Sequence, residues 1–376
     1  MVDGFINFNL NEKTPTIIKV IGVGGGGGNA VEYMYDKGIC DVDFVICNTD
    51  YQALKNSPIP NKVQLGKALT EGHGAGNNPL MGEKSAQESL EDIEVLLKKN
   101  TKMVFITAAM GGGTGTGAAP VIAKLAKDMG ILTVGIVSVP ARFEGPKRLD
   151  QARDGLRKLK DHVDCLIVID NEKIKSIYGS QTISAAFAKA NDVLNIAAKG
   201  IAEIITLPGY INVDFADVRT VMTDSGVAIM GAAQASGEDR AIRAITEALE
   251  SPLLNNNDIL GAKDILLNIT SGTDEITMDE MSQITSHIIR KVGNNAAVIW
   301  GVGTDLNLGD AVSVTIIATG FPTGDIDILD KEVKKEPVAP VRLTEDEVAV
   351  KPGMEAKKIR ELENIPAFER RDLRVN

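Results

Sequence analysis

The chain has 376 residues, of which 44% are hydrophobic, 24% charged and only 4% aromatic. This length is enough for two domains with full hydrophobic cores. The formal net charge of −11 argues against nonspecific binding to nucleic acid or to an anionic membrane. The scarcity of aromatic residues argues against a surface that stacks bases.

The lack of a recognisable targeting signal and the cysteine usage both predict a cytoplasmic protein. The first residues, MVDGFINFNLNEK, lack the basic start and the apolar core of a signal peptide. No apolar run approaches the ~18 residues needed to cross a bilayer. The three cysteines (Cys40, Cys47 and Cys165) lack CxxC spacing, which favours buried free thiols in a reducing compartment. We therefore expect no direct membrane insertion and no nucleic-acid partner.

Strand and helix patterns alternate along the first half of the chain, after a segment (1–16) that we expect to be flexible. Apolar runs predict strands at 17–23, 43–47, 103–109, 132–139 and 165–170. Amphipathic periodicity predicts helices at 29–37, 83–99, 118–129 and 146–163. This alternation implies an α/β fold with a doubly wound, mostly parallel sheet. Ligands bind such sheets over the carboxyl ends of the strands.

A long helix separates this region from a second one. Residues 183–207 are expected to form one helix of about 37 Å, which Pro208 and Gly209 end. Beyond a loop and helix at 208–226, the pattern predicts a smaller α+β domain over 227–321. Its strands are expected at 227–234, 264–270, 295–304 and 311–319, and its helices at 238–250 and 279–292.

The composition changes after residue 321. Residues 322–358 are charged, contain prolines and have few large apolar side chains, which predicts a disordered linker. Residues 359–376 regain Ile365, Pro366 and Phe368 beside several arginines. Such a segment at the end of a tether is typical of a docking peptide that folds on its partner. From the residues alone, a merely disordered tail is the better interpretation.

Two glycine-rich segments follow predicted strands: GVGGGGGNA (22–30) and GGGTGTG (111–117). Glycines let the backbone bring several N–H groups against one anion, and the following helix adds its positive dipole end. Alone, the first segment satisfies GxGxxG with Asp50 about 20 residues further on, the fingerprint of a dinucleotide-binding fold. A monomeric FAD- or NAD-dependent oxidoreductase is therefore an open alternative. Two converging segments fit a triphosphate better, because one can hold its α/β end and the other its γ end.

The glycine segments cannot hydrolyse a triphosphate by themselves. No GxxxxGK[ST] motif occurs and neither segment contains a lysine, so backbone N–H groups, helix dipoles and a cation, expected to be Mg²⁺, must meet the phosphate charge. The sequence does not identify ligands for this metal. Neither segment carries a side chain that could activate water, so that group must come from elsewhere. His73, in GHGAGNNP, is expected to line the site rather than to catalyse.

Four motifs in order, GVGGGGGNAV, MGGGTGTGAAPV, RFEGPKR and NVDFADVRTVM, closely resemble the FtsZ family of bacterial tubulin-like cell-division GTPases. The resemblance covers about residues 17–321. It implies a tubulin-like fold in which a Rossmann-like GTPase domain (17–182) is joined by a central helix (183–207) to the smaller α+β domain.

The resemblance also implies roles for individual residues in binding GTP. Glu144 and Arg148 match positions that bind the nucleotide sugar, Asn171 and Asp192 match those that read the guanine edge, and Phe187 matches the ring stacked on the base. The phosphates are expected to lie against Gly25, Gly26, Gly27, Gly28, Asn29, Gly112, Gly113, Thr114 and Gly115.

The missing catalytic group is implied to lie in NVDFADVR. Unaided, Asp214 and Asp217 would be interpreted as helix-start carboxylates stabilised by the dipole. In the family, this loop inserts into the nucleotide site of the next subunit, so Asn212, Asp214 and Asp217 are expected to complete that subunit's GTPase site. Hydrolysis is then coupled to head-to-tail assembly into the protofilaments of a cytokinetic ring at mid-cell. The tail sequence ENIPAFERR resembles the family peptide that binds membrane-tethering division proteins such as FtsA.

Overall fold

The structure, a computed structural model, describes residues 16–39, 41–206, 210–211, 213–250, 259–293 and 296–321. All of them belong to one compact unit, Met1–Lys331. The predicted flexible segment up to residue 15, Cys40, Asn212, the predicted linker and the docking peptide with Ile365, Pro366 and Phe368 lie outside the described residues.

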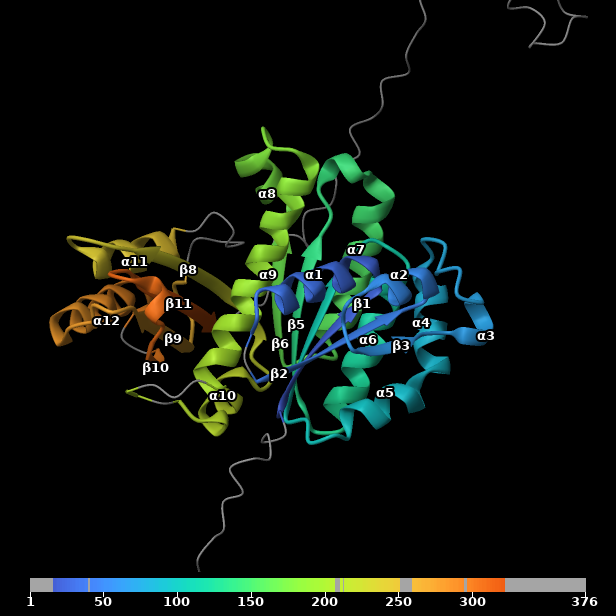
Figure 1. Cartoon of the computed structure of the whole chain (residues 1–376), viewed down its shortest axis with the longest axis horizontal. Helices are drawn as coiled ribbons and strands as arrows, with labels where there is room; N and C mark the ends of the chain where they lie inside the picture. The colour runs from blue at the N-terminus through green and yellow to red at the C-terminus, as the bar shows by residue number, and fades with distance from the viewer. Residues whose placement is uncertain are drawn as a thin grey trace, which may run out of the picture. The chain divides into compact units, whose positions relative to one another are not determined.

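A seven-stranded sheet lies at the centre of the larger of the two regions of the described chain. Its strands have the order β3-β2-β1-β4-β5-β6-β7 (Figure 1). Every strand pairing in it is parallel, which confirms the predicted α/β class. The strands are β1 (Ile18–Val23), β2 (Val42–Asn48), β3 (Asn61–Gln64), β4 (Met103–Ala109), β5 (Leu132–Val139), β6 (Cys165–Asp170) and β7 (Gly226–Val227).

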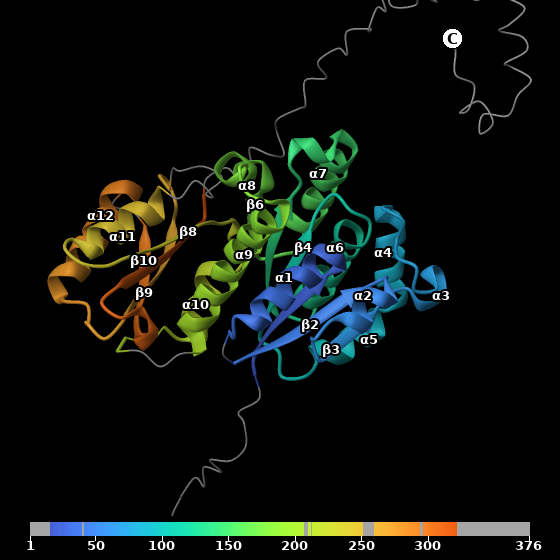
Figure 2. The same ribbon diagram turned by 45° about the horizontal axis from the view of Figure 1, so that its top comes forward.

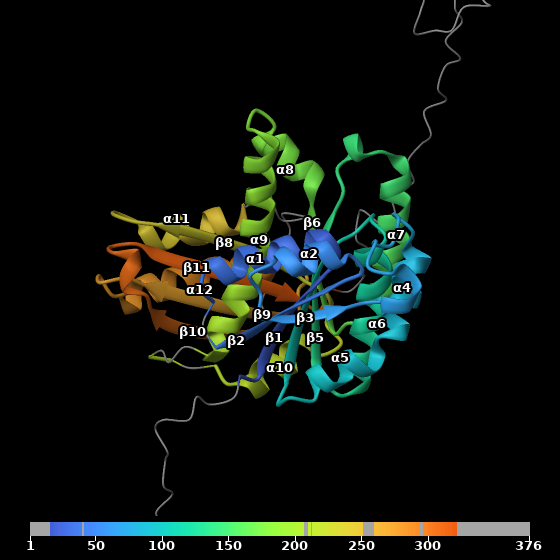
Figure 3. The same ribbon diagram turned by 45° about the vertical axis from the view of Figure 1, so that its right-hand side comes forward.

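Helices cover both faces of this sheet, because its strands are apolar on both sides. Val20 and Phe105 pack with helices α1 and α9, whereas their neighbours Ile21 and Ile106 pack with α5, α6 and α7 on the other face (Figure 3). The helices of this region are α1 (Gly24–Asp36), α2 (Tyr51–Asn56), α3 (Lys67–Thr70), α4 (Pro79–Glu88), α5 (Leu90–Leu97), α6 (Thr114–Asp128), α7 (Pro146–Lys160), α8 (Asn171–Tyr178) and α9 (Ile183–Thr206).

Two helices begin earlier than the sequence pattern predicts. Helix α1 starts at Gly24 rather than at residue 29, and α6 starts at Thr114 rather than at 118. Glycine disfavours a helix by about 1 kcal/mol per residue, but only glycine fits here. A Cβ at Gly26 would stand 2.4 Å from the Cβ of Ala109, and one at Gly27 would stand 2.4 Å from the carbonyl oxygen of Thr107. Close packing on β4 therefore overrides propensity.

The single helix predicted at 83–99 is wrong, because the chain forms α4 and α5 there, with a break at Ser89. The Ser89 hydroxyl accepts a hydrogen bond from the Gly66 N–H at 3.1 Å and donates one to the Gln64 carbonyl at 3.4 Å. A side chain that bonds to a neighbouring loop competes with helix continuation. The short elements α2, β3 and α3 were not predicted.

The strand predicted at 227–234 is two strands in different sheets. Strand β7 pairs with β6 at the edge of the large sheet, and β8 (Ile229–Ala235) begins the second sheet. The second sheet has the order β10-β9-β11-β8 and mixes parallel and antiparallel pairs, as an α+β region should. Its remaining elements are α11 (Arg240–Leu249), β9 (Asp264–Ser271), α12 (Met278–Val292), β10 (Ala297–Thr304) and β11 (Val312–Thr319) (Figure 2).

The two cysteines that the structure describes confirm the expectation of buried free thiols. Cys47 and Cys165 are both unpaired and buried in the large sheet. Burial raises the pKa of each thiol to about 12. Among the described residues, no helix is long and apolar enough to span a membrane.

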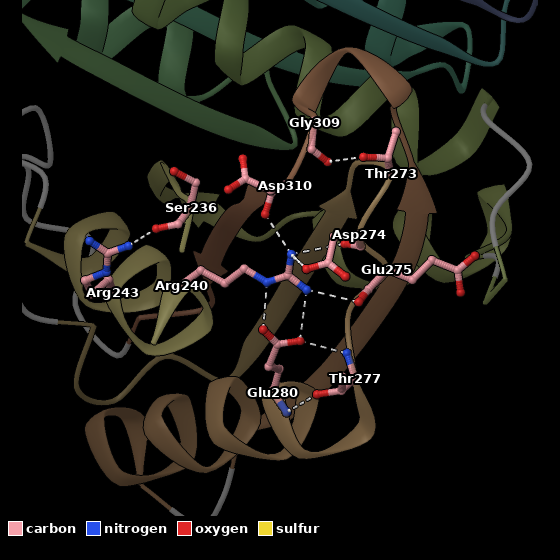
Figure 4. Close-up of polar contacts among 10 residues, drawn as sticks. All are labelled: Ser236, Arg240, Arg243, Thr273, Asp274, Glu275, Thr277, Glu280, Gly309 and Asp310. Atoms are coloured by element: carbon pink, nitrogen blue, oxygen red, sulfur yellow. Dashed lines mark hydrogen bonds and ion pairs between the residues drawn. The ribbon is translucent and has the colours of Figure 1, made fainter. Parts of the chain in front are cut away.

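A buried arginine joins two loops and the start of α12 in the smaller sheet region (Figure 4). Arg240 is only 5% exposed. Its guanidinium donates to both carboxylate oxygens of Glu280, at 2.7 and 3.2 Å. It also donates to the backbone carbonyls of Asp274, Glu275 and Asp310, at 3.1, 3.0 and 2.7 Å. A buried cation with five donors can be satisfied in this way, whereas lysine cannot reproduce the fork.

Glu280→Ala is expected to lower the free energy of unfolding by about 1–3 kcal/mol, because two donors of the buried Arg240 guanidinium lose their acceptor. The Asp274 carboxylate, 2.8 Å from the guanidinium, still balances part of its charge. Urea unfolding measures the change. Glu247→Ala, an exposed site on α11, is the control and should stay within about 0.5 kcal/mol of the parent protein. An equally small effect at Glu280 would contradict the account of this cluster.

The same variant should show a defined pH dependence. The hydrogen bond from Arg240 lowers the pKa of Glu280 below its ordinary 4.5. The stabilisation is therefore complete above about pH 4.5 and is lost as the pH falls through the lowered value. The difference in unfolding free energy between the parent protein and Glu280→Ala should accordingly shrink in acid.

Candidate nucleotide-binding site

A cavity of about 430 Å³ lies at the carboxyl ends of β1, β4, β5 and β6 and beside the first half of α9. This is the edge at which ligands bind doubly wound sheets. Eleven of the residues expected to bind nucleotide line it: Gly25, Gly26, Asn29, Gly112, Gly113, Thr114, Gly115, Glu144, Arg148, Asn171 and Phe187.

Two helices, α1 with 13 residues and α6 with 15, begin at this cavity. Helix α1 starts directly after β1 and α6 starts shortly after β4, so their first N–H groups have no partner within the helix. Both dipoles have their positive ends here, which favours bound anions. A Cβ at Gly25 or Gly112 would meet nothing within 4 Å, so the space beside both glycines is open to a ligand. The geometry fits two phosphate cradles that face one cavity.

The loops around the cradles are tied together by side chains. The hydroxyls of Thr49 and Thr114 lie 2.7 Å apart and share a hydrogen bond. Glu144 accepts from the Ala141 N–H at 3.0 Å and from the Arg148 guanidinium at 2.9 Å. The Arg148 side chain is still 51% exposed. Glu144 and Arg148 are thus oriented at the cavity wall before any ligand arrives.

The other end of the cavity is suited to a planar base. Phe187 is 46% exposed and lines the wall, where a ring could stack on it. The Oδ1 atom of Asn171 is buried and has no hydrogen-bond partner. Leaving a buried acceptor unpaired costs about 1–3 kcal/mol. A donor on a ligand at this position would remove that cost.

Three expected residues do not line the cavity: Gly27, Gly28 and Asp192. Gly27 instead packs against the carbonyl of Thr107 in β4. Asp192 instead accepts a hydrogen bond from the Tyr33 hydroxyl at 3.1 Å, and burial, together with this carboxylate, raises the pKa of Tyr33.

Sequence reasoning missed other wall residues, among them Ala190, Asn191 and Leu194. Together with Phe187 they have the spacing i, i+3, i+4, i+7. That spacing marks a single face of a helix, so once Phe187 was placed at the cavity this pattern could have identified them.

The expected catalytic carboxylates lie at the opposite end of the large sheet. Asp214 caps α10 (Phe215–Met222), where its side chain accepts from the Asp217 N–H at 2.8 Å, and both aspartates are exposed. Helix α10 leads into β7, which pairs with Cys165 at the amino end of β6, whereas Asn171 follows the carboxyl end. Figures 1 and 2 show α10 near the end of α9 that lies away from α8.

The length of α9 indicates how far apart these groups are. Leu194 lines the cavity, and the helix continues for 12 residues to Thr206, or about 18 Å along its axis. Asp214 and Asp217 therefore cannot reach the cavity of their own chain in this conformation. Asn212 lies outside the described residues.

Comparisons with known proteins agree with this geometry. The model of the Tubulin/FtsZ family GTPase domain matches residues 17–179, and that of the FtsZ family C-terminal domain matches 226–322. The cell division protein FtsZ of Porphyromonas gingivalis is 48% identical over 337 residues, which cover 89% of this chain and 73% of that protein. The chain belongs to the FtsZ family.

Other similar proteins and solved structures agree with this family assignment. The FtsZ of Azotobacter vinelandii is 49% identical over 319 residues, covering 84% of this chain and 80% of that protein. A solved empty FtsZ dimer from M. jannaschii is 42% identical, with a TM-score of 0.76 over 82% of this chain and 89% of that one. CetZ2 of Haloferax volcanii, 22% identical, has a TM-score of 0.69 over 83% of this chain and 96% of that one, and shares the fold.

Membership of the FtsZ family confirms the expected tubulin-like fold, GTP binding and GTPase activity, and gives no support to the oxidoreductase alternative. The contacts of Asp50 also argue against a dinucleotide-binding site. In a dinucleotide-binding fold, the acidic residue after the second strand would bind a ribose. Here the Asp50 side chain accepts from the N–H groups of Gln52 and Ala53 at the start of α2. His73 forms an isolated bridge with Asp50 and does not line the cavity.

Proposed function

We propose that this FtsZ-family chain polymerises head-to-tail into protofilaments of the cytokinetic ring, and that each contact hydrolyses GTP with carboxylates from the neighbouring subunit. A cell-division GTPase that associates with itself is what the family supports. The observation that carries the finer proposal is the separation of the cavity from Asp214 and Asp217 by the length of the large sheet. When the nucleotide cavity and the catalytic carboxylates lie at opposite ends of the sheet, they can meet only between two subunits. Such a heterologous contact repeats along a filament.

In this proposal the cavity holds GTP with its phosphates on the two helix starts. The α1 cradle (Gly25, Gly26 and Asn29) takes the α/β end, and the α6 cradle (Gly112–Gly115) takes the γ end. Because the N–H groups and dipoles are fixed before the reaction, they stabilise the charge that develops on the transferring phosphoryl group. Glu144 and Arg148 hold the sugar.

Base selection is assigned to Asn171, Phe187 and Asp192. Phe187 stacks on the base, and the unpaired Oδ1 of Asn171 accepts from it. A role for Asp192 requires the base to approach beside the Tyr33 hydroxyl. The hydrogen bond from Tyr33 engages only one carboxylate oxygen, and an ionised carboxylate can accept several. An acceptor facing the N1–H and N2–H₂ edge would favour guanine over adenine.

Mg²⁺ is assigned to the γ end of the site, where it would neutralise phosphate charge. Mg²⁺ in nucleotide sites is commonly held through substrate phosphates, retained waters and one or two protein groups. Over the described ranges, no group of three or more His, Cys, Asp or Glu side chains could hold a metal ion. Thr114, at the cavity wall, is the residue of the α6 cradle that bears a hydroxyl and could face it.

Asp217 is assigned the role of orienting and deprotonating the attacking water in the neighbour's site. Asp214 already uses Oδ1 to cap α10, so it positions the helix start and presents its second oxygen to the same water. Neither carboxylate acts on the GTP of its own chain.

We further propose that the protein acts in the cytoplasm at the mid-cell division site. Ile365, Pro366 and Phe368 are proposed to dock on a membrane-tethering division protein such as FtsA. The tail resemblance supports this assignment, and the residues lie outside the described part of the chain.

The test of the proposed function is the GTPase rate per subunit as a function of protein concentration. Turnover should be very low in dilute protein and rise to a plateau as filaments form, with light scattering rising in parallel. A rate per subunit that is constant over all concentrations would contradict catalysis between subunits.

A further inference from the structure

The segment before α10 is attached to the smaller sheet at two points. The Tyr210 hydroxyl donates to the Glu275 carboxylate at 2.6 Å. The next residue, Ile211, forms an isolated bridge with Val302 of β10, in which each N–H donates to the other carbonyl at 3.4 and 3.1 Å. Asp214 follows Ile211 by only three positions, so the start of α10 depends on where this segment is held.

The backbone of the residue that provides the first acceptor is itself held in place. The carbonyl of Glu275 accepts from the buried Arg240 guanidinium, as does that of Asp274 next to it. Figure 4 shows the Glu275 carboxylate pointing away from Arg240 while its backbone is drawn toward it. The loop between β9 and α12 is therefore a rigid support that presents one carboxylate outward.

The attachment adds little burial of its own. Tyr210 is 70% exposed, and Glu275 is exposed as well. A hydrogen bond between exposed groups contributes little to the stability of the fold. It does fix a direction, because the rigid tyrosine ring has only two side-chain torsions.

We propose that Glu275 is a positioning residue for hydrolysis, which acts through the Tyr210 hydroxyl to fix the segment that presents Asp214 and Asp217 to the neighbouring subunit. This inference rests on the proposed function of the two aspartates. The contact is separate from the nucleotide cavity, since none of these four residues lines it. Loss of the contact should therefore change the rate of the chemical step and leave GTP binding unchanged.

The experiment compares Tyr210→Phe, Glu275→Ala, Glu275→Gln and the double variant Tyr210→Phe/Glu275→Ala. Tyr210→Phe removes only the hydroxyl, and kcat should fall roughly three- to tenfold with an unchanged KM for GTP, the amount expected for one hydrogen bond. Glu275→Ala should do the same. Glu275→Gln keeps an acceptor oxygen and should restore most of the rate. The double variant should be no slower than either single one, because both remove the same interaction.

Two measurements separate positioning from a structural role. Thermal unfolding and sedimentation with a slowly hydrolysed GTP analogue should match the parent protein for every variant, and rates are expressed per polymerised subunit. Tyr35→Phe, which keeps a ring on the exposed side of α1, should be without effect. An unchanged kcat in Tyr210→Phe, additive losses in the double variant, or a loss explained by weaker assembly would each overturn the proposal.

Asp217→Ala is measured in the same series. If it loses turnover while Tyr210→Phe does not, only the positioning role fails. If Asp217→Ala keeps full turnover, the proposed function of the aspartates fails, and the positioning role fails with it.

Discussion

Asp217→Ala is expected to lower GTP turnover per subunit by about 10²–10⁴-fold, the usual contribution of a positioned general base. GTP binding should be unchanged, because Asp217 lies at the end of the large sheet opposite to the cavity. The fold should also be retained. The side chain is exposed, and its interaction with the α10 dipole contributes only about 0.3–1 kcal/mol.

Single-turnover hydrolysis, GTP binding and thermal unfolding of Asp217→Ala measure these three expectations separately. Thr220→Ala, an exposed change one turn later on α10, is the matched control and should hydrolyse GTP at the parent rate. Loss of GTP binding by Asp217→Ala, or turnover equal to that of the control, would contradict the role given to Asp217.

Gly112→Asp is expected to weaken GTP binding strongly by placing a carboxylate in the α6 cradle. A Cβ at Gly112 meets no protein atom within 4 Å, so the variant should fold normally. Two like unit charges about 4 Å apart near a protein surface repel by about 4 kcal/mol. The dissociation constant for GTP should therefore rise by roughly 30- to 1,000-fold, which corresponds to about 2–4 kcal/mol.

The control for charge is Gly112→Asn, which has the same shape as aspartate without its charge. It should weaken GTP binding much less than Gly112→Asp, and the difference should shrink as salt is added. Titration of both variants with a fluorescent GTP analogue makes the comparison. If both variants lost GTP affinity equally, the volume of the new side chain rather than its charge would be responsible. That result would contradict a phosphate group beside Gly112.

The sequence predicted the large sheet well because its strands are buried on both faces. Continuous apolar runs such as MVFITAA predict buried strands, and β4, β5 and β6 have the predicted bounds. The helix starts were predicted too late because glycine has a poor helix propensity, and the close approach of Gly26 to Ala109 is visible only in three dimensions. The short strand β7 was missed because two residues carry no periodicity.

The position of the site could be predicted where a motif fixes the backbone, whereas the partner of a single side chain could not. The roles of the individual residues stay predictions. The glycine segments had to lie at the carboxyl ends of β1 and β4, and they do. That Asp192 would bond to Tyr33, 159 positions earlier in the chain, could not be read from local sequence. Nor could a pattern reveal that Asp214 and Asp217 lie away from the cavity, because this depends on the direction in which α9 crosses the sheet.

The most direct test of catalysis between subunits is to mix Asp217→Ala with Gly112→Asp. The first variant binds GTP but lacks the base, and the second carries the base but stays largely empty at a GTP concentration chosen just to saturate the first. Each alone should therefore be nearly inactive. In an equal mixture, about one contact in four should pair a bound GTP with an intact Asp217 of the neighbour. The account predicts that mixing restores about that share of the parent GTPase rate. A mixture as inactive as its two components would contradict it.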